Sequence, residues 1–301
     1  MKARIKKISV LCVVALTVGI LSGCSGNSAT STTAENTSAK AASDKESAAS
    51  KADDKQTEAA KQNKGSKDSD AKFTVGFDKD FPPMGFVGDD GEFTGFDLEL
   101  AKEAAKRLNM EVVYQPIAWE AKELEIENGN IDCIWNGFTM EDREDKYTFV
   151  GPYMANKQVF VVKEEGIQSV SDLKGKTVEV QKDSSGLTAL NRDENKSLKD
   201  SFASLVEVGD YQSAMMDLET GACDAVCMDS VVAEYQIKST KKPFRILKDS
   251  LSEEKYGIGF KKGNTALSDA VKKTLLEMKE DGTVDKITEK WFGTKDSFVL
   301  Q

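Results

Sequence analysis

The order of apolar and polar segments predicts an α/β protein built from two lobes. Strand-like and helix-like segments alternate from residue 73 onward, which is the pattern of a parallel α/β sheet. The same alternation begins again after residue 157, and a further strand and helices follow residue 256. Because the chain must leave lobe 1 and return to it, we expect two crossings, with hinges near residues 156–158 and 253–256.

Lobe 1 is predicted to comprise residues 73–156 and 256–301. In its first part Asp97 is placed to cap a helix, because aspartate is favoured at that position. The apolar face of this helix joins residues three and four positions apart: Leu98, Ala101, Ala105 and Leu108. The other predicted elements of lobe 1 are strands at 73–77, 111–115, 131–135 and 256–260, a hairpin closed by 93–96, helices at 119–127 and 267–279, and a last helix marked by Val284, Ile287 and Trp291.

Lobe 2 is predicted to comprise residues 157–255. Gly221 is expected to end a helix at 211–220, because glycine readily adopts the left-handed conformation that terminates helices. The other predicted elements of lobe 2 are strands at 158–163, 177–181, 205–208 and 222–228, a helical turn at 171–175, and a helix that starts near 184–185.

The first 23 residues have the plan of a secretory signal peptide. Four basic residues precede an apolar run at 8–20, which is shorter than the roughly 20 residues that a membrane span needs. The run ends in Leu21-Ser22-Gly23-Cys24, which matches the bacterial lipobox. This motif predicts transfer of diacylglycerol to the Cys24 thiol and cleavage before it. An ordinary signal peptide with a chance cysteine is the alternative.

The mature chain is expected to be strongly acidic. Removing 1–23 takes away four Lys and Arg residues and no Asp or Glu, so the net charge of −10 becomes −10 − 4 = −14. Such a charge disfavours nucleic acid and anionic lipid headgroups as partners, so we expect no nucleic-acid partner and a membrane attachment through the lipid anchor alone. Residues 24–72 are predicted to be a disordered tether, because from residue 25 they contain no Val, Ile, Leu, Met or aromatic residue. A coil of this length would span about 40 Å.

The residue inventory excludes many kinds of chemistry. The chain has no histidine, so Ser-His-Asp, Cys-His and His-metal sites are excluded for this polypeptide alone. Cys133, Cys223 and Cys227 lie in apolar runs and are expected to be buried thiols, the last two on one strand, rather than disulfides or zinc ligands. The acidic segment 89–92 is expected to be a hairpin turn. We therefore predict no catalytic residues, no cofactor and no metal.

The segment 130–143 carries the strongest functional signal. Its apolar run is expected to end at Asn136-Gly137, where small residues at the end of a strand leave backbone groups open to a ligand. The hydroxyl of Thr139 and the guanidinium of Arg143 then suit a carboxylate, which the planar guanidinium grips with two parallel hydrogen bonds. Considered without a known relative, the charged neighbours of Arg143 at 141–146 favour a solvated run of charges instead.

This segment resembles the core motif of the amino-acid-binding proteins of ABC importers, solute-binding protein family 3. The consensus of that family reads roughly G-x-D-x-x-x-x-G-(M/F/L)-T followed by an arginine. One departure is the spacing, since the commoner G-x-T-x-T-x-E-R has one more residue before the arginine than the present chain. Further segments resemble the family in order, and these are Gly76-x-Asp78-x-x-Phe81-Pro82-Pro83-Met84 and residues 94–98, 171–178, 223–229, 256–264 and 281–293.

The resemblance implies how the carboxylate of an amino acid is held. It assigns this group to Arg143, to Thr139 and to the amide of Gly137. Ser184 and Ser185 are expected to donate from the start of a lobe 2 helix, whose N-terminus favours an anion.

The resemblance also assigns the ammonium and the side chain. The ammonium is expected on Asp229, on the carbonyl of Asn136 or Gly137, and on the oxygen of Thr139. Phe81 is expected to form an apolar wall, and Asp78 either touches the far end of the ligand or anchors its own loop. The remaining expectations concern Gln181 as a further ligand-binding residue, Trp119 as pocket wall or core, and Lys122 with Glu123 as solvent-facing residues or as an adaptation to a polar ligand side chain.

Together these features predict a type II periplasmic-binding-protein fold and a receptor for a polar amino acid. The receptor would be a monomeric lipoprotein on the outer face of a bacterial cell membrane, of the Gram-positive type, and would deliver its ligand to ABC permease subunits. Two alternatives remain open on the same fold. One is an enzyme similar to cyclohexadienyl dehydratases, and the other is a module that senses an amino acid for a membrane receptor.

Overall fold

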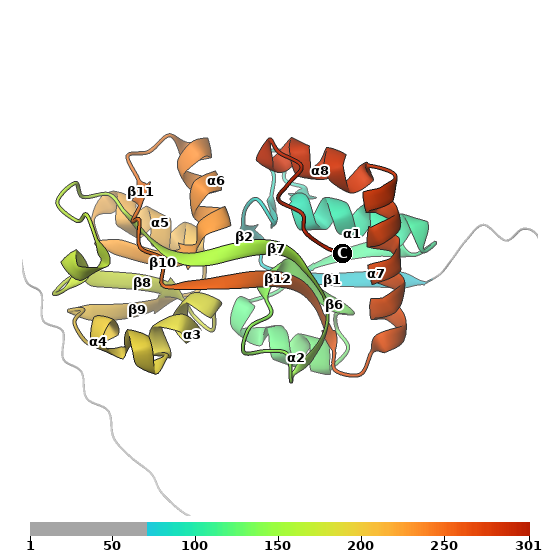
Figure 1. Ribbon diagram of the computed structural model, residues 1–301, viewed down its shortest axis with the longest axis horizontal. Coiled ribbons are helices and arrows are strands. Elements are labelled where there is room, and N and C mark those ends of the chain that lie inside the picture. Colours follow the sequence, from blue (N-terminus) through green and yellow to red (C-terminus); the bar gives the residue numbers. More distant parts are fainter. Residues whose placement is uncertain (1–70) are drawn as a thin grey trace, which may run out of the picture. The chain divides into compact units, whose positions relative to one another are not determined.

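The structure is a computed structural model that describes residues 71–301 (Figure 1). The predicted signal peptide, the lipidation site Cys24 and nearly all of the predicted tether lie outside the described residues. Within the described part, the strands form a nine-stranded sheet and a separate three-stranded sheet. The strand order of the larger sheet is β5-β1-β6-β12-β7-β10-β8-β9, with β11 paired to β7.

Lobe 1 contains three neighbouring parallel strands. β1 (Lys72–Phe77) lies between β5 (Glu111–Pro116) and β6 (Cys133–Thr139) and pairs with both. The sequence predicted all three strands. β6 begins two residues later than expected and does not end at Asn136-Gly137, because it continues to Thr139 alongside β12.

Helix α1 (Phe96–Arg107) buries the apolar face that its residue spacing predicted. Its buried residues include Leu98, Ala101 and Ala105, and removing their apolar surface from water stabilises the lobe by about 25 cal/mol per Å². The helix contacts two others of lobe 1, which are α7 (Thr265–Glu280) and α8 (Thr283–Phe292). The predicted cap is wrong, because Gly95 occupies the N-cap position and Asp97 lies inside the first turn with its side chain buried.

Lobe 2 contains a second set of parallel strands. β8 (Thr177–Gln181) has the predicted bounds and lies between β9 (Ser204–Val208) and β10 (Ala225–Asp229). Helix α5 (Tyr211–Thr220) also has its predicted bounds and ends at Gly221, whose φ of 80° is the expected left-handed conformation.

Two further helices of lobe 2 flank these strands. The predicted helix near 184–185 is α3 (Ser185–Asn191). A helix that the sequence did not predict, α6 (Ser230–Thr240), follows β10 directly. Adjacent Val231 and Val232 weaken the helical signal, because β-branched residues favour strands. Burial of Val232 and Ala233 against the rest of the lobe supports the helix instead.

Two long antiparallel strands join the lobes (Figure 1). β7 (Tyr147–Val162) and β12 (Ser252–Lys261) pair with each other along most of their length. In lobe 1 β12 also pairs with β6, and in lobe 2 β7 also pairs with β10. The two predicted hinge segments are thus directly paired, since Asn156 lies opposite Glu254.

Three smaller features complete the fold. The expected hairpin turn at 89–92 connects β3 to β4, and the amide of Gly88 donates to the carbonyl of Glu92 at 2.8 Å. The three cysteines of the described part are buried free thiols, although Cys223 precedes β10 while Cys227 lies within it. The remaining elements are β2 (Asp80–Phe81), β3 (Gly85–Val87), β4 (Phe93–Thr94), η1 (Trp119–Ala121), α2 (Lys122–Glu127), η2 (Val170–Leu173), η3 (Asp193–Asn195), α4 (Lys196–Lys199) and β11 (Arg245–Ile246).

Candidate functional site

Polar side chains from four strands meet where the lobes join. Thr139 ends β6 and Asp229 ends β10, so both lie at the carboxyl ends of parallel strands, where α/β sheets commonly bind ligands. The crossing strands add Asn156 and Gln158 from β7 and Glu254 from β12. All five side chains are buried.

Two carboxyl groups form the centre of this cluster. Asp229 is 3% exposed and Glu254 is 6% exposed. The amide nitrogen of Asn156 donates to Asp229 Oδ1 at 2.7 Å and to Glu254 Oε1 at 2.6 Å. The amide nitrogen of Gln158 donates to the same two oxygens at 2.9 and 2.8 Å. Both carboxyl oxygens therefore lie within hydrogen-bond reach of two shared donors.

Two further hydroxyl groups donate to the carboxyl pair. Tyr256 donates to Asp229 Oδ1 at 2.7 Å, and Thr139 donates to Glu254 Oε1 at 2.9 Å. No Lys or Arg nitrogen of residues 71–301 lies within 4.0 Å of either carboxyl group. Burial, and after it the charge of Glu254, raise the pKa of Asp229 well above its usual value.

Arg143 follows β6 and is held without an acidic partner. Its guanidinium donates to the carbonyl of Thr139 at 3.1 Å and lies 4.8 Å from the ring centre of Phe138, a cation–π contact. Burial lowers the pKa of Arg143, although a guanidinium stays charged at neutral pH. Within the described part of the chain it forms no ion pair. It is therefore a charged group available to an anion.

A cavity of about 200 Å³ reaches Arg143 and one edge of the cluster, although Asp229, Asn156 and Gln158 do not line it. Its lining includes Thr139, Arg143, Ser185 and Glu254, and it is formed by both lobes. Ser185 accepts a hydrogen bond from Gln158 at 3.0 Å and reaches Glu254 Oε1 at 3.4 Å. The cavity thus brings the guanidinium of Arg143 and the buried carboxyl group of Glu254, neither of which has an ion-pair partner in the described part of the chain, to the same space.

Two ion pairs between the lobes border this cavity. The ammonium of Lys122 contacts the carboxylate of Asp183 and donates to its backbone carbonyl at 3.0 Å. Arg192 of lobe 2 contacts Asp142 of lobe 1 at 2.6 Å. Of the two alternatives for Lys122, the structure excludes exposure to solvent, since the side chain is 1% exposed. Glu123, in contrast, is half exposed and pairs with Lys146 on the surface.

Three further predicted residues, Asp78, Gln181 and Phe81, make contacts between the two lobes. Gln181 of β8 donates to Asp78 Oδ2 at 2.6 Å, which joins the two lobes. Burial raises the pKa of Asp78 to about 6. The amide of Asp78 donates to Asn136 Oδ1 at 3.0 Å, so this residue also anchors its own loop. Phe81 contacts the ring of Tyr211 across the lobes, with 5.9 Å between the ring centres.

Trp119 lies at the border of two environments. Its ring packs edge-on against Phe138 with 5.7 Å between centres, and the side chain is buried in a small apolar cluster. It also lines a neighbouring opening that Asp78 and Asp210 share. Trp119 is therefore part of the core and borders the cleft at the same time.

The backbone at Gly137 is committed to the interior of lobe 1. Its amide donates to Asp97 Oδ2 at 2.7 Å, and the hydroxyl of Tyr153 shares that oxygen at 2.8 Å. In this conformation the amide is not available to a ligand carboxylate. The φ of 57° favours glycine, and a Cβ here would lie 3.0 Å from the rings of Phe81 and Tyr256.

Ser184 has a local role in the structure. It occupies the N-cap position of α3, and its hydroxyl oxygen accepts from the amide of Leu187 at 3.1 Å. Of the predicted residues, Thr139, Arg143 and Ser185 line the cavity, whereas Ser184 and Gly137 make the local contacts described above.

Sequence reasoning missed several members of the cluster. Glu254, Tyr256, Asn156 and Gln158 all fall inside the two predicted hinge segments. Strand periodicity could have found them, because residues two apart share one face of a strand. The signal was available once the hinges were interpreted as strands.

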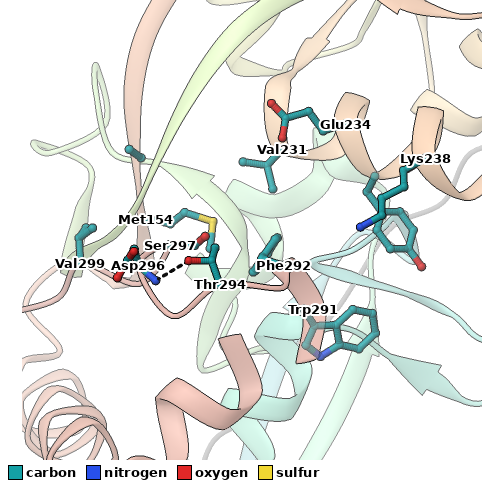
Figure 2. A pocket seen from close by; sticks show the side chains of 12 residues that line it. Met154, Val231, Glu234, Lys238, Trp291, Phe292, Thr294, Asp296, Ser297 and Val299 are labelled. Carbon is teal, nitrogen blue, oxygen red and sulfur yellow. Dashed lines mark hydrogen bonds between the residues drawn. The ribbon is translucent and has the colours of Figure 1, made fainter. Parts of the chain in front are cut away.

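A second cavity, of about 330 Å³, is separate from this site (Figure 2). It lies between α6, which contributes Val231 and Glu234, and the segment that contains Trp291 and Phe292. None of the predicted site residues lines it.

In the described range, no helix is long and apolar enough to cross a membrane, and no group of three or more acidic or sulfur-bearing side chains could hold a metal ion.

Two α/β lobes joined by two crossing strands, with a polar cavity between them, define the type II periplasmic-binding-protein class. The chain belongs to the bacterial extracellular solute-binding proteins, family 3, whose profile matches residues 73–294.

Named relatives give the family more detail. The L-cystine-binding protein TcyJ of Escherichia coli (strain K12) is 33% identical over 226 residues, which are 73% of this chain and 82% of that protein. The arginine-binding extracellular protein ArtP of Bacillus subtilis (strain 168) is 30% identical over 235 residues, 76% of this chain and 89% of that protein. A solved structure of an ABC uptake transporter substrate-binding protein from Streptococcus pneumoniae with bound histidine has a TM-score of 0.72 at 33% identity, covering 75% of this chain and 94% of that chain.

Proposed function

We propose that this protein captures a polar α-amino acid outside the cytoplasm and delivers it to an ABC importer. One observation carries the proposal. A buried guanidinium without an acidic partner and a buried carboxyl group without a basic partner line the same cavity between the lobes. An amino acid carries the complementary pair of charges. Each buried charge needs such a partner, because an unpaired charge in the interior is costly.

The cluster suggests a role for each residue. Arg143 would hold the ligand carboxylate with two hydrogen bonds, aided by Ser185. Asp229 and Glu254 would hold the ammonium, and Thr139 would orient Glu254 through its hydroxyl. Phe81, Trp119, Asp78 and Gln181 would then flank the ligand side chain, with Asn136, Gly137 and Ser184 supporting the backbone around it.

Ligand binding would favour the arrangement in which the two lobes are closed. Contacts between the lobes, such as Lys122 with Asp183 and Gln181 with Asp78, are made in the closed arrangement. A ligand that contacts both lobes favours this arrangement, and a permease can recognise it. We place the lobe boundaries at 73–156 with 256–301 for lobe 1, and at 157–255 for lobe 2.

The location of the protein follows from its N-terminal sequence. A lipid on Cys24 would anchor the chain to the outer face of a bacterial cell membrane, with 24–72 as a tether, and the Gram-positive type of envelope suits this plan. The binding protein would act as a monomer with its permease subunits.

The identity of the amino acid can be tested directly. Named relatives bind cystine, arginine and histidine, all of which carry a polar side chain. Mass spectrometry of small molecules released on denaturation, followed by calorimetry with a panel of L-amino acids and L-cystine, should identify one tight polar ligand. If no member of the panel binds, an amino-acid receptor is the wrong function.

The enzyme alternative has a separate test. The named relatives are binding proteins rather than enzymes. Purified protein should therefore not convert prephenate or arogenate. Loss of amino-acid uptake after deletion would distinguish the importer from a sensor, which would leave uptake intact.

A further inference from the structure

The carboxyl pair of Asp229 and Glu254 is unusual for a group that must receive a single ammonium. The two acids come from different strands, yet their oxygens share the amide donors of Asn156 and Gln158 at 2.6 to 2.9 Å. Two ionised carboxylates this close repel each other strongly in a buried site. A cation or one retained proton would relieve this repulsion.

We propose that Glu254 is the second half of the ammonium site, and that the carboxyl pair holds one proton which an arriving ammonium replaces. The inference rests on the proposed function and adds a residue and a proton to it. Before binding, the pair with its proton carries a charge of −1. After binding, two carboxylates and one ammonium also carry −1. The proton leaves to solvent, and the charge of the cluster stays the same.

The surrounding hydrogen bonds have room for a further donor. Gln158 is fully buried and its Nε2 is used by both acids, but its Oε1 has no hydrogen-bond partner. That oxygen lies beside the first turn of α3, 2.8 Å from where a Cβ on Gly186 would be. An ammonium offers three N–H groups, so it can donate to both carboxylates and retain one donor for a neighbouring acceptor.

The groups that face the pair cannot exchange the proton themselves near neutral pH. Burial raises the pKa of Tyr256 and of Tyr211 well above the usual value, and burial also raises that of Cys227. Arg143 and Arg192 both feel the charge of Glu254, and guanidinium groups stay protonated at neutral pH. The carboxyl pair is the proton source that remains in direct contact with the ammonium position.

Other buried acids lie farther along the cleft and need a control. Burial raises the pKa of Asp78 to about 6, and its carboxylate contacts Gln181 rather than the pair. Burial raises the pKa of Asp97 to about 7, but this group lies behind the amide of Gly137. A proton released from Asp78 would be lost in Asp78→Asn and retained in Glu254→Gln, which is the opposite of our expectation.

The sign of the pH dependence follows from the exchange. Burial and Glu254 raise the pKa of Asp229, so the ligand-free pair keeps a proton into the range above its usual pKa. An ammonium favours the ionised pair and expels that proton. Affinity should therefore rise with pH while the free pair is still protonated, and level off once it is not. The slope of log affinity against pH should approach about one.

Calorimetry in buffers of different ionisation enthalpy counts the released protons. The probe is the tightest-binding member of the panel of L-amino acids and L-cystine, titrated between about pH 6 and 7.5 in phosphate and in imidazole, which both buffer in this range and differ in ionisation enthalpy. We expect up to about one proton released per bound amino acid in the natural protein. Release should be smaller in Glu254→Gln, because burial still raises the pKa of Asp229 there but the charge of Glu254 no longer does. Glu253→Gln is the matched control, because its side chain is exposed and pairs with Lys157 on the surface. It should release protons as the natural protein does.

Each outcome decides the proposal. Binding without proton release in the natural protein, or unchanged release in Glu254→Gln, would overturn the proton exchange while leaving the amino-acid receptor intact. If Glu254→Gln does not fold, as judged by circular dichroism, the N-acetyl derivative of the same amino acid replaces it as the test. This derivative lacks an ammonium and should release no proton, so equal release with both probes would refute the inference. If no amino acid binds, the proposed function falls and the inference falls with it.

Discussion

The ammonium of Lys122 crosses from lobe 1 to bind both the carboxylate and the backbone carbonyl of Asp183 in lobe 2. The side chain of Lys122 is 1% exposed, whereas that of Asp183 is 54% exposed. The two partners therefore differ in their access to water. If the lobes part, Lys122 would keep only its contacts with the carbonyl and ring of Trp119 in its own lobe, whereas Asp183 is already in contact with water.

Replacing Lys122 tests whether this contact stabilises the closed arrangement. Lys122→Met retains most of the chain length and removes the charge. We expect amino-acid binding to weaken by about 1 kcal/mol, roughly fivefold, because one partly exposed ion pair is lost from the closed form. Calorimetry gives the affinity, and small-angle scattering gives the ligand-free dimensions. Glu123→Gln removes only an exposed ion pair and should change neither. A Lys122→Met variant with unchanged affinity would show that the contact does not contribute to closure.

Arg143 should hold the ligand carboxylate through its planar fork. Arg143→Lys keeps the charge but loses the bidentate geometry, so binding should weaken by about 1.5–3 kcal/mol. Glu144→Gln, on the exposed side of the same segment, is the control and should have little effect. A decarboxylated analogue should bind the natural protein poorly and lose little more in Arg143→Ala, because one interaction cannot be lost twice. Additive losses would mean that Arg143 does not contact the carboxylate.

Removing Asp229 should have a large effect on affinity. Asp229→Ala leaves the ammonium with only part of its site, and we expect a loss of about 2–5 kcal/mol in binding free energy. Asp249→Ala, an exposed acid of the same lobe, provides the control. Isothermal titration of both variants is the measurement, and an affinity equal to that of the natural protein would exclude Asp229 from the site.

Asp97 should make the stability of the protein depend on pH. Burial raises its pKa from 3.8 to about 7, so its contribution to stability is complete below pH 3.8 and is lost as the pH rises through about 7. In Asp97→Asn the amide oxygen can still accept hydrogen bonds from Gly137 and Tyr153, but the side chain at this position no longer titrates. Relative to this variant, the natural protein should lose up to about 4 kcal/mol of unfolding free energy over that range. Urea unfolding at several pH values gives the comparison. Parallel curves would show that Asp97 does not titrate as described.

Cys24 should determine membrane attachment without affecting the fold. Cys24→Ala removes the thiol that would carry the lipid, and the described domain begins only near residue 71. We expect precursor to accumulate, or protein to be released if another peptidase cleaves it. Fractionation and mass spectrometry of the N-terminus are the measurements. A processed, acylated and membrane-bound variant would rule out the lipobox.

Local sequence patterns predicted most of the fold because the relevant forces act between neighbours in the chain. The bounds of β8 and α5 followed from strand composition and from a glycine at the helix end. The helix α6 was missed because its valines disfavour helices locally, and burial of Val232 against the lobe compensates for this only after folding. Asp97 was assigned to a helix cap because only its neighbours in the chain were considered. Its true partners, Gly137 and Tyr153, lie 40 and 56 residues away.

The candidate site was predictable only in part. Motif resemblance pointed to Thr139 and Asp229, although the predicted strands stopped short of both residues. Glu254 has no motif of its own, and its role depends on which strand lies opposite β7. Likewise, the burial of Lys122 depends on Asp183 in the other lobe. Such pairings are set by tertiary register, which a single sequence does not contain.

The length of β7 has a mechanical consequence. Its 16 residues run through both lobes, and Asn156 and Gln158 lie on the stretch that changes lobe. The amides that hold the proposed ammonium-binding carboxyl pair are therefore part of the same strand that would bend if the lobes moved. A bend in β7 would change the hydrogen bonds that Asn156 and Gln158 make to the carboxyl pair, and a change in those hydrogen bonds would in turn favour a bend in β7. Substitutions at Asn156 or Gln158 should alter both the rate at which the lobes open and the direct contacts at the site. Substitutions at Lys122 or Arg192 should instead alter the equilibrium between the open and closed forms and leave the contacts at the carboxyl pair unchanged.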